Sequence, residues 1–174
     1  MNQIILASHG GLAAGAKDTL EMVLGDVSNV HVVSLARDDK EPITNKVEAM
    51  IATFNADDTV YVLTDMLGSS VNNNMVELSK NGTKFTVVSG FNIPLALTLA
   101  MSSAPVKGAE LAALINEART GLTNPNAPVE AAAAPAKKVK ASRHSSGPAK
   151  IVLARLDYRL LHGQVVFTWT TKVQ

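Results

Sequence analysis

Two short segments of the sequence carry side chains that could do chemistry together. His9 lies in Ser8-His9-Gly10-Gly11, directly after an apolar run, and Asp65 follows a second apolar run. A carboxylate that accepts a hydrogen bond from one imidazole nitrogen fixes the tautomer and leaves the lone pair of the other nitrogen free. Such a histidine can act as a nucleophile. The residue types therefore predict a nucleophilic imidazole steered by a carboxylate, provided that the two segments meet.

Small residues follow both candidate groups, and each segment is then followed by an amphipathic stretch. This order predicts two strand–turn–helix units, with N–H groups at each helix start that favour an anion such as a phosphoryl group. The predicted phosphate-binding residues are Gly10, Gly68, Ser69 and Ser70. The pattern leaves a plain alternative open, because a histidine after a strand can be structural and an aspartate there can cap the next turn. Gly10-Gly11 is neither a Walker loop nor a dinucleotide fingerprint.

Apolar periodicity predicts an α/β fold in which strands and helices alternate. The first predicted strand begins at Ile4, and the other three are Val30–Leu35, Thr59–Thr64 and Phe85–Ser89. The predicted helices are Leu12–Leu24, a helix that begins at Pro42, Val71–Lys80, a helix that begins at Asn92 and Pro94 and runs to Met101, and Ala109–Arg119. The alternation of leucines at 95, 97 and 99 leaves a strand open for the fourth helix. Alternating elements indicate an open, doubly wound, mostly parallel sheet with helices on both faces. The first and third strands of such sheets are often neighbours, which would bring His9 and Asp65 to one edge.

Charge and composition change near Leu122. Residues 1–122 hold 8 Lys+Arg and 13 Asp+Glu, whereas residues 123–174 hold 8 and 2. Residues 123–149 are rich in Ala, Pro and Lys and predict a flexible linker. No aromatic residue interleaves their basic cluster, so we expect no nucleic-acid partner. Residues 150–174 resume strand character but are too few to bury a core, which indicates a truncated second α/β domain.

The composition also excludes several classes of protein. There is no cysteine, so disulfides and thiolate chemistry are excluded. No metal is expected, because His31 lies inside a predicted strand, His144 lies in the linker, and no zinc-type spacing occurs. No apolar run approaches the roughly 18 residues of a membrane span. The N-terminus also lacks the pattern of a signal peptide. We therefore expect a soluble protein that is not exported.

Several stretches, in this order, resemble the mannose-family enzyme IIA–IIB component of the phosphoenolpyruvate-dependent sugar phosphotransferase system (PTS). They are Ile4–Gly11, Leu63–Ser70, Gly90–Pro94, the Ala/Pro/Lys-rich linker, and Arg155–Val165, which is similar to the opening of a IIB domain. The resemblance implies a mannose-type IIA domain over residues 1–122, a linker over 123–149 and an N-terminal IIB fragment over 150–174.

The resemblance also implies a function. The phosphocarrier HPr would give a phosphoryl group to Nε2 of His9, with Asp65 on the other nitrogen and Ser70, with Ser69, on the phosphate oxygens. A IIB histidine, matched here by His162, would take the group next and pass it to a sugar moved by the membrane subunits IIC and IID. No cofactor or metal is implied. A homodimer is expected, often with an exchanged strand, in the cytoplasm at the inner membrane face through IIC and IID.

Two other functions remain open for the same fold. One is the phosphodonor subunit of a dihydroxyacetone kinase, against which the IIB-like stretch Arg155–Val165 argues. The other is a non-catalytic regulatory domain, in which His9 and Asp65 would have separate surroundings.

Overall fold

Four parallel strands form the sheet in the computed structural model, which describes residues 1–126. The strands are β1 (Asn2–His9), β2 (Val30–Leu35), β3 (Thr59–Thr64) and β4 (Thr86–Ser89). Their order is β2-β1-β3-β4, and every pairing is parallel. The first and third strands are therefore neighbours, as the sequence predicted, and their carboxyl ends lie at the same edge of the sheet.

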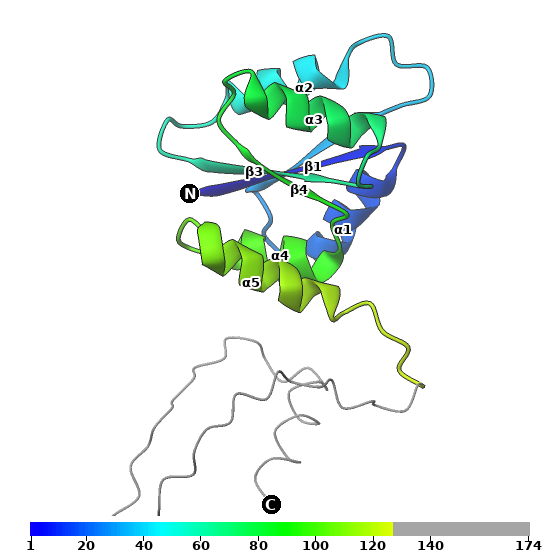
Figure 1. The fold of residues 1–174 in the computed structure, drawn as a ribbon, viewed down its shortest axis with the longest axis vertical. Helices are drawn as coiled ribbons and strands as arrows, with labels where there is room; N and C mark the ends of the chain where they lie inside the picture. The colour runs from blue at the N-terminus through cyan, green and yellow to red at the C-terminus, as the bar shows by residue number, and fades with distance from the viewer. Residues whose placement is uncertain (127–174) are drawn as a thin grey trace, which may run out of the picture. The chain divides into compact units, whose positions relative to one another are not determined.

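Helices cover both faces of the sheet (Figure 1). On one face lie α1 (Leu12–Leu24), α4 (Ile93–Met101) and α5 (Gly108–Arg119), and on the other lie α2 (Ile43–Ile51) and α3 (Ser70–Lys80). Each face has its own apolar core. The predicted α/β class, with a parallel sheet between two helical layers, is confirmed.

The central position of β1 follows from its composition. Ile4 and Leu6 belong to the core beneath α1 and α4, whereas Ile5 and Ala7 belong to the core beneath α2 and α3. Successive strand side chains point to opposite faces, so a run that is apolar at every position needs cover on both sides. All four side chains are fully buried. The strand that carries His9 is therefore the most enclosed one in the described part of the chain.

The region that the sequence left ambiguous is a helix. The Asn92 side chain accepts a hydrogen bond from the Leu95 N–H at 3.1 Å, and Pro94 lies in the first turn. Leu95 and Leu99 then face the core, one helical turn apart. The strand interpretation of the leucine alternation is wrong, because the Asn92 cap and the proline both favour a helix start. Other predicted boundaries differ by one or two residues, which is usual for element ends.

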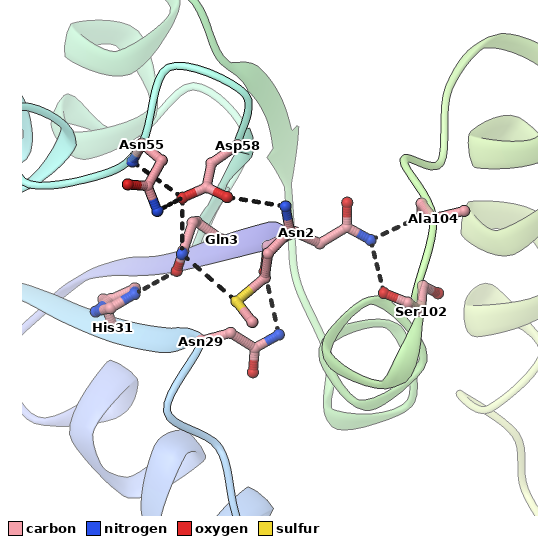
Figure 2. A network of polar contacts seen from close by, with 9 residues as sticks. Asn2, Gln3, Asn29, His31, Asn55, Asp58, Ser102 and Ala104 are labelled. Atoms are coloured by element: carbon pink, nitrogen blue, oxygen red, sulfur yellow. Dashed lines mark hydrogen bonds and ion pairs between the residues drawn. The ribbon is translucent and has the colours of Figure 1, made fainter.

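A polar network lies at the amino ends of the strands (Figure 2). Gln3, in β1, contacts β2 and the turn before β3: its Oε1 lies 2.8 Å from His31 Nε2, and its Nε2 donates to Asp58 Oδ2 at 3.1 Å. The Met1 amine lies 2.8 Å from Asp58 Oδ1. This hydrogen bond and that of Gln3 lower the pKa of Asp58 to about 2. Burial, with a smaller effect of Lys17, lowers the pKa of His31.

The first residue of β1 ties this network to the α4–α5 connection. Asn2 Nδ2 donates to the carbonyl oxygens of Ser102, at 3.0 Å, and Ala104, at 2.9 Å (Figure 2). Asn29 Nδ2 in turn donates to the Asn2 carbonyl at 3.1 Å. The amino edge is thereby held by side-chain hydrogen bonds, and the carboxyl edge is left for the candidate site.

The linker beyond residue 126 and the predicted domain over 150–174, with His162, lie outside the described residues. The division into 1–122, 123–149 and 150–174 therefore stays a prediction. Over residues 1–126, no helix has both the length and the apolar character to cross a bilayer.

Candidate functional site

His9 and Asp65 meet at the carboxyl edge of the sheet. His9 is the last residue of β1, and Asp65 follows the last residue of β3. The His9 Nδ1 atom lies 2.6 Å from Asp65 Oδ2, and the same oxygen accepts the His9 backbone N–H at 2.9 Å. The imidazole is 40% exposed, but the carboxylate is only 4% exposed. The structure thus brings the two predicted groups together, with the ring outward and the carboxylate behind it.

Four hydrogen bonds hold the Asp65 carboxylate. Besides the two from His9, Oδ1 accepts the Met66 N–H at 2.7 Å and the Ser69 hydroxyl at 3.0 Å. Burial alone would raise the pKa of Asp65, but these hydrogen bonds together hold it below its ordinary value. Asp65 is therefore ionised at neutral pH. Since an ionised carboxylate only accepts, Nδ1 of His9 carries a proton, and in the neutral ring Nε2 then keeps its lone pair.

Ser70 lies on the free side of the ring. Its Oγ is 2.9 Å from His9 Nε2, so in the neutral ring with the proton on Nδ1 the hydroxyl donates to the lone pair that an electrophile would otherwise meet. Ser70 is exposed and begins α3. A hydroxyl rotates freely about its C–O bond. It can therefore leave Nε2 and donate to an oxygen of a group bound there.

The other three predicted phosphate-binding residues have partners within the protein. The Gly10 N–H donates to the Leu35 carbonyl at 3.0 Å, and the Gly68 N–H donates to Asn72 Oδ1 at 3.0 Å. Ser69 is the N-cap of α3, and its hydroxyl accepts the Asn72 N–H at 3.2 Å. Among the four, the side chain of Ser70 is therefore the best placed to meet an anion. The first-turn N–H groups of α3 begin beside it.

Glycines shape both turns beside the ring. Gly10 has φ +55° and Gly68 has φ +79°, in the region that residues with a side chain rarely adopt. Gly10 lets the chain turn from β1 into α1, and Gly68 lets it turn from Asp65 back into α3. The two turns lead into α1, which starts three residues after His9, and into α3, whose first residue contacts the His9 ring.

Sequence reasoning missed two buried polar residues whose hydrogen bonds hold the segments next to His9 and Asp65. Asn72 is 3% exposed and bonds to the Gly68 N–H and, through Nδ2, to Thr64 Oγ1 at 3.0 Å. Ser8 is fully buried and accepts the Ala13 N–H at 2.8 Å. One feature of the sequence could have indicated a buried role for Asn72: it is a polar residue among the buried positions of α3, next to Val71.

Exposed apolar side chains lie in the segments that follow His9 and Asp65. Leu12, Met66 and Leu67 are 55%, 59% and 85% exposed. We call these three residues the apolar rim. Leu12 is the first residue of α1, and Met66 and Leu67 lie in the turn between Asp65 and α3. Exposed apolar side chains that gather at a polar site are typical of a surface that another protein covers. Over residues 1–126, no group of three or more His, Cys, Asp or Glu side chains lies close enough to hold a metal ion.

The comparisons with known proteins point in one direction. The family model described as "PTS system fructose IIA component" matches residues 3–118. The "PTS system mannose-specific EIIAB component" of Escherichia coli K12 is 31% identical, over 96% of this chain and 55% of that protein. The chain thus spans about half the length of the curated relatives it matches.

Solved structures agree on the fold. A "PTS IIA protein associated with the fucose utilization operon" from Streptococcus pneumoniae is 30% identical, with a TM-score of 0.61 over 71% of this chain and 92% of that one. The "mannose/sorbose specific IIA subunit" from Enterococcus faecalis has a TM-score of 0.62 over 73% and 96%; at 24% identity this likeness shows the fold alone.

Proposed function

The chain belongs to the family of phosphotransferase system (PTS) fructose IIA components, and from this premise we propose that His9 carries a phosphoryl group in phosphoenolpyruvate-dependent sugar uptake. The observation that carries the proposal is the state of the imidazole. Its Nδ1 is held at 2.6 Å by an ionised carboxylate, and its Nε2 faces outward. A ring with a locked proton on one nitrogen and an exposed lone pair on the other is prepared for nucleophilic attack.

The proposed step is a direct transfer between two imidazoles. The Nε2 lone pair of His9 attacks phosphorus on a phosphohistidine donor, a new N–P bond forms, and the donor's N–P bond breaks. The electron pair returns to the donor nitrogen. The His9 ring keeps its Nδ1 proton and gains positive charge, which the Asp65 carboxylate compensates. The Ser70 hydroxyl turns from Nε2 to an oxygen of the bound phosphoryl group.

The apolar rim supports a protein, rather than a small molecule, as the donor. Leu12, Met66 and Leu67 are exposed apolar residues in the segments that follow His9 and Asp65, and the imidazole itself is 40% exposed. A partner that brings its own histidine amid apolar residues would cover this rim and exclude water from the transfer. We propose HPr as that donor.

The proposed acceptor is the histidine of a IIB domain, which His162 matches in this sequence. The group would then reach a sugar through the membrane subunits IIC and IID, which would hold the protein at the cytoplasmic face of the membrane. We further propose that it works as a homodimer. The resemblance stated above and the family membership support these partners.

Phosphorylation by the purified system tests the proposal. Incubation with phosphoenolpyruvate, enzyme I and HPr should label the protein, and the adduct should be acid-labile and base-stable, as a phosphohistidine is. His9→Ala should abolish the label, whereas the matched control His31→Gln should keep it. Full labelling of His9→Ala would contradict the site. Acceptor arms with a IIB domain and with a dihydroxyacetone kinase distinguish the two phosphate routes.

A further inference from the structure

Asn72 is a buried polar side chain for which the transfer step above has no use. It belongs to the first turn of α3 and is 3% exposed, next to Val71, which packs in the core. A polar side chain is costly to bury without hydrogen bonds. Asn72 has them on every side. Its Oδ1 accepts from the Gly68 N–H at 3.0 Å, its Nδ2 donates to Thr64 Oγ1 at 3.0 Å, and its backbone N–H donates to Ser69 Oγ at 3.2 Å.

These three bonds surround one short segment of chain. Thr64 ends β3 directly before Asp65, and Gly68 and Ser69 end the turn that follows. Asn72 therefore fixes both ends of residues 64–69. Ser69 also donates to Asp65 Oδ1 at 3.0 Å, so the hydroxyl that accepts from the Asn72 backbone N–H is itself a support of the carboxylate. That backbone bond does not depend on the residue type; the Asn72 side chain acts through Thr64 and Gly68.

This segment and the residue that follows it carry the two groups that contact the His9 ring. Asp65 contacts Nδ1, and Ser70, the residue after the clamped turn, contacts Nε2. We propose that Asn72 is a positioning residue for phosphoryl transfer at His9, because it holds the carboxylate and the hydroxyl on opposite nitrogens of the ring. The expected effect on phosphoryl transfer rests on the proposed function. The positioning of the unphosphorylated ring does not, and it can be tested separately.

Asparagine suits this position for a chemical reason. One end of its amide accepts from a backbone N–H while the other end donates to a hydroxyl oxygen. A leucine of similar size fills the space but leaves the Gly68 N–H without an acceptor. The positive φ of Gly68 is then no longer held by a hydrogen bond, and the turn is free to shift. A displacement of about 1 Å in a positioning group can slow a reaction by roughly 100-fold.

The test uses Asn72→Leu, with Asn74→Leu as the matched control on the same helix. Within residues 1–126 the half-buried Asn74 side chain makes no hydrogen bond. Asn72→Leu should slow phosphorylation of His9 by about 10- to 100-fold at saturating phosphorylated HPr, with KM within about twofold. The control should retain the wild-type rate. A rate for Asn72→Leu within about twofold of wild type would overturn the proposal.

A double variant separates positioning from simple stability. Thr64→Val together with Asn72→Leu removes both partners of one buried hydrogen bond, which costs less stability than removing one partner. The double variant should recover part of the lost resistance to urea while its transfer rate stays low. Recovery of the rate together with the stability would show a purely structural role and overturn the proposal.

Nitrogen NMR of the unphosphorylated protein completes the test. Wild-type His9 should show a single tautomer with the proton on Nδ1, and Asn72→Leu should show a mixture of the two tautomers. This readout needs no phosphodonor. A wild type that shows the single tautomer but takes no phosphate would refute the proposed function alone, whereas an unchanged tautomer in Asn72→Leu would refute the positioning role.

Discussion

Asp65→Asn is the most informative single substitution for the proposed chemistry. The change keeps the size of the side chain but removes its charge and turns one acceptor oxygen into an NH2 donor. Each Asp65 oxygen accepts two hydrogen bonds, one pair from His9 and the other from Met66 and Ser69. In either orientation of the amide, two donors therefore face an NH2 group. The ring also loses the group that fixes its tautomer.

The magnitude follows from the bond that is lost. A hydrogen bond to a charged group contributes about 1.5–3 kcal/mol, and about 1.4 kcal/mol corresponds to a tenfold change in rate. Loss of the charged bond to Nδ1 should therefore slow the phosphorylation of His9 by about 10- to 100-fold. A ring that takes its proton on Nε2 cannot attack, which lowers the rate further.

Rapid-quench measurement of phosphoryl transfer from phosphorylated HPr gives this rate directly. The matched control is Asp57→Asn, because Asp57 is exposed and lies in the turn before β3. Circular dichroism should show that both variants fold. If Asp65→Asn is folded and its transfer rate stays within about twofold of wild type, the carboxylate does not steer the imidazole and the reasoning fails.

Three further predictions concern Ser70, the apolar rim and Asp58. Ser70→Ala removes the hydroxyl 2.9 Å from Nε2 and should slow transfer by about fivefold in the same quench assay, because one neutral hydrogen bond contributes about 1 kcal/mol. Leu67→Glu should raise KM for phosphorylated HPr without changing the melting temperature, because Leu67 is 85% exposed. The control Met22→Glu, at a methionine on α1 that is 84% exposed, should leave KM unchanged. The lowered pKa of Asp58 adds stability that is complete above the unfolded pKa of about 3.9 and is lost as the pH falls through about 2. Urea denaturation at a series of pH values should therefore show a smaller loss of stability between pH 4 and pH 2 for Asp58→Asn than for wild type.

The sequence predicts the fold well because apolar patterning reports which surfaces are covered. The unbroken apolar run of β1 indicates a strand with helices on both sides, and that is where the strand lies. The rule that parallel strands share their carboxyl edge then brings His9 to Asp65. The leucine alternation in α4 misleads because it fits two periodicities at once, and the hydrogen bond that decides between them involves Asn92.

Hydrogen-bond partners within the site are harder to predict from one sequence. Gly68, Ser69 and Ser70 form a uniform run of small residues, yet Gly68 bonds to Asn72, Ser69 caps α3, and Ser70 alone meets the ring. The three roles depend on the direction in which each group leaves the turn. That direction is set by the φ of Gly68 and by the start of α3, which composition does not encode.

The two ends of β1 have different roles. Gln3 and the network around it hold the chain together at one end, and His9 reacts at the other. Natural variation can therefore follow two separate routes. Changes around Gln3 and Asp58 should alter how much intact protein survives heat, acid or proteases, because abundance follows folding stability. Changes around His9 should alter the output of each surviving molecule. Substitutions at the amino ends of the strands can therefore change stability without changing the site around His9.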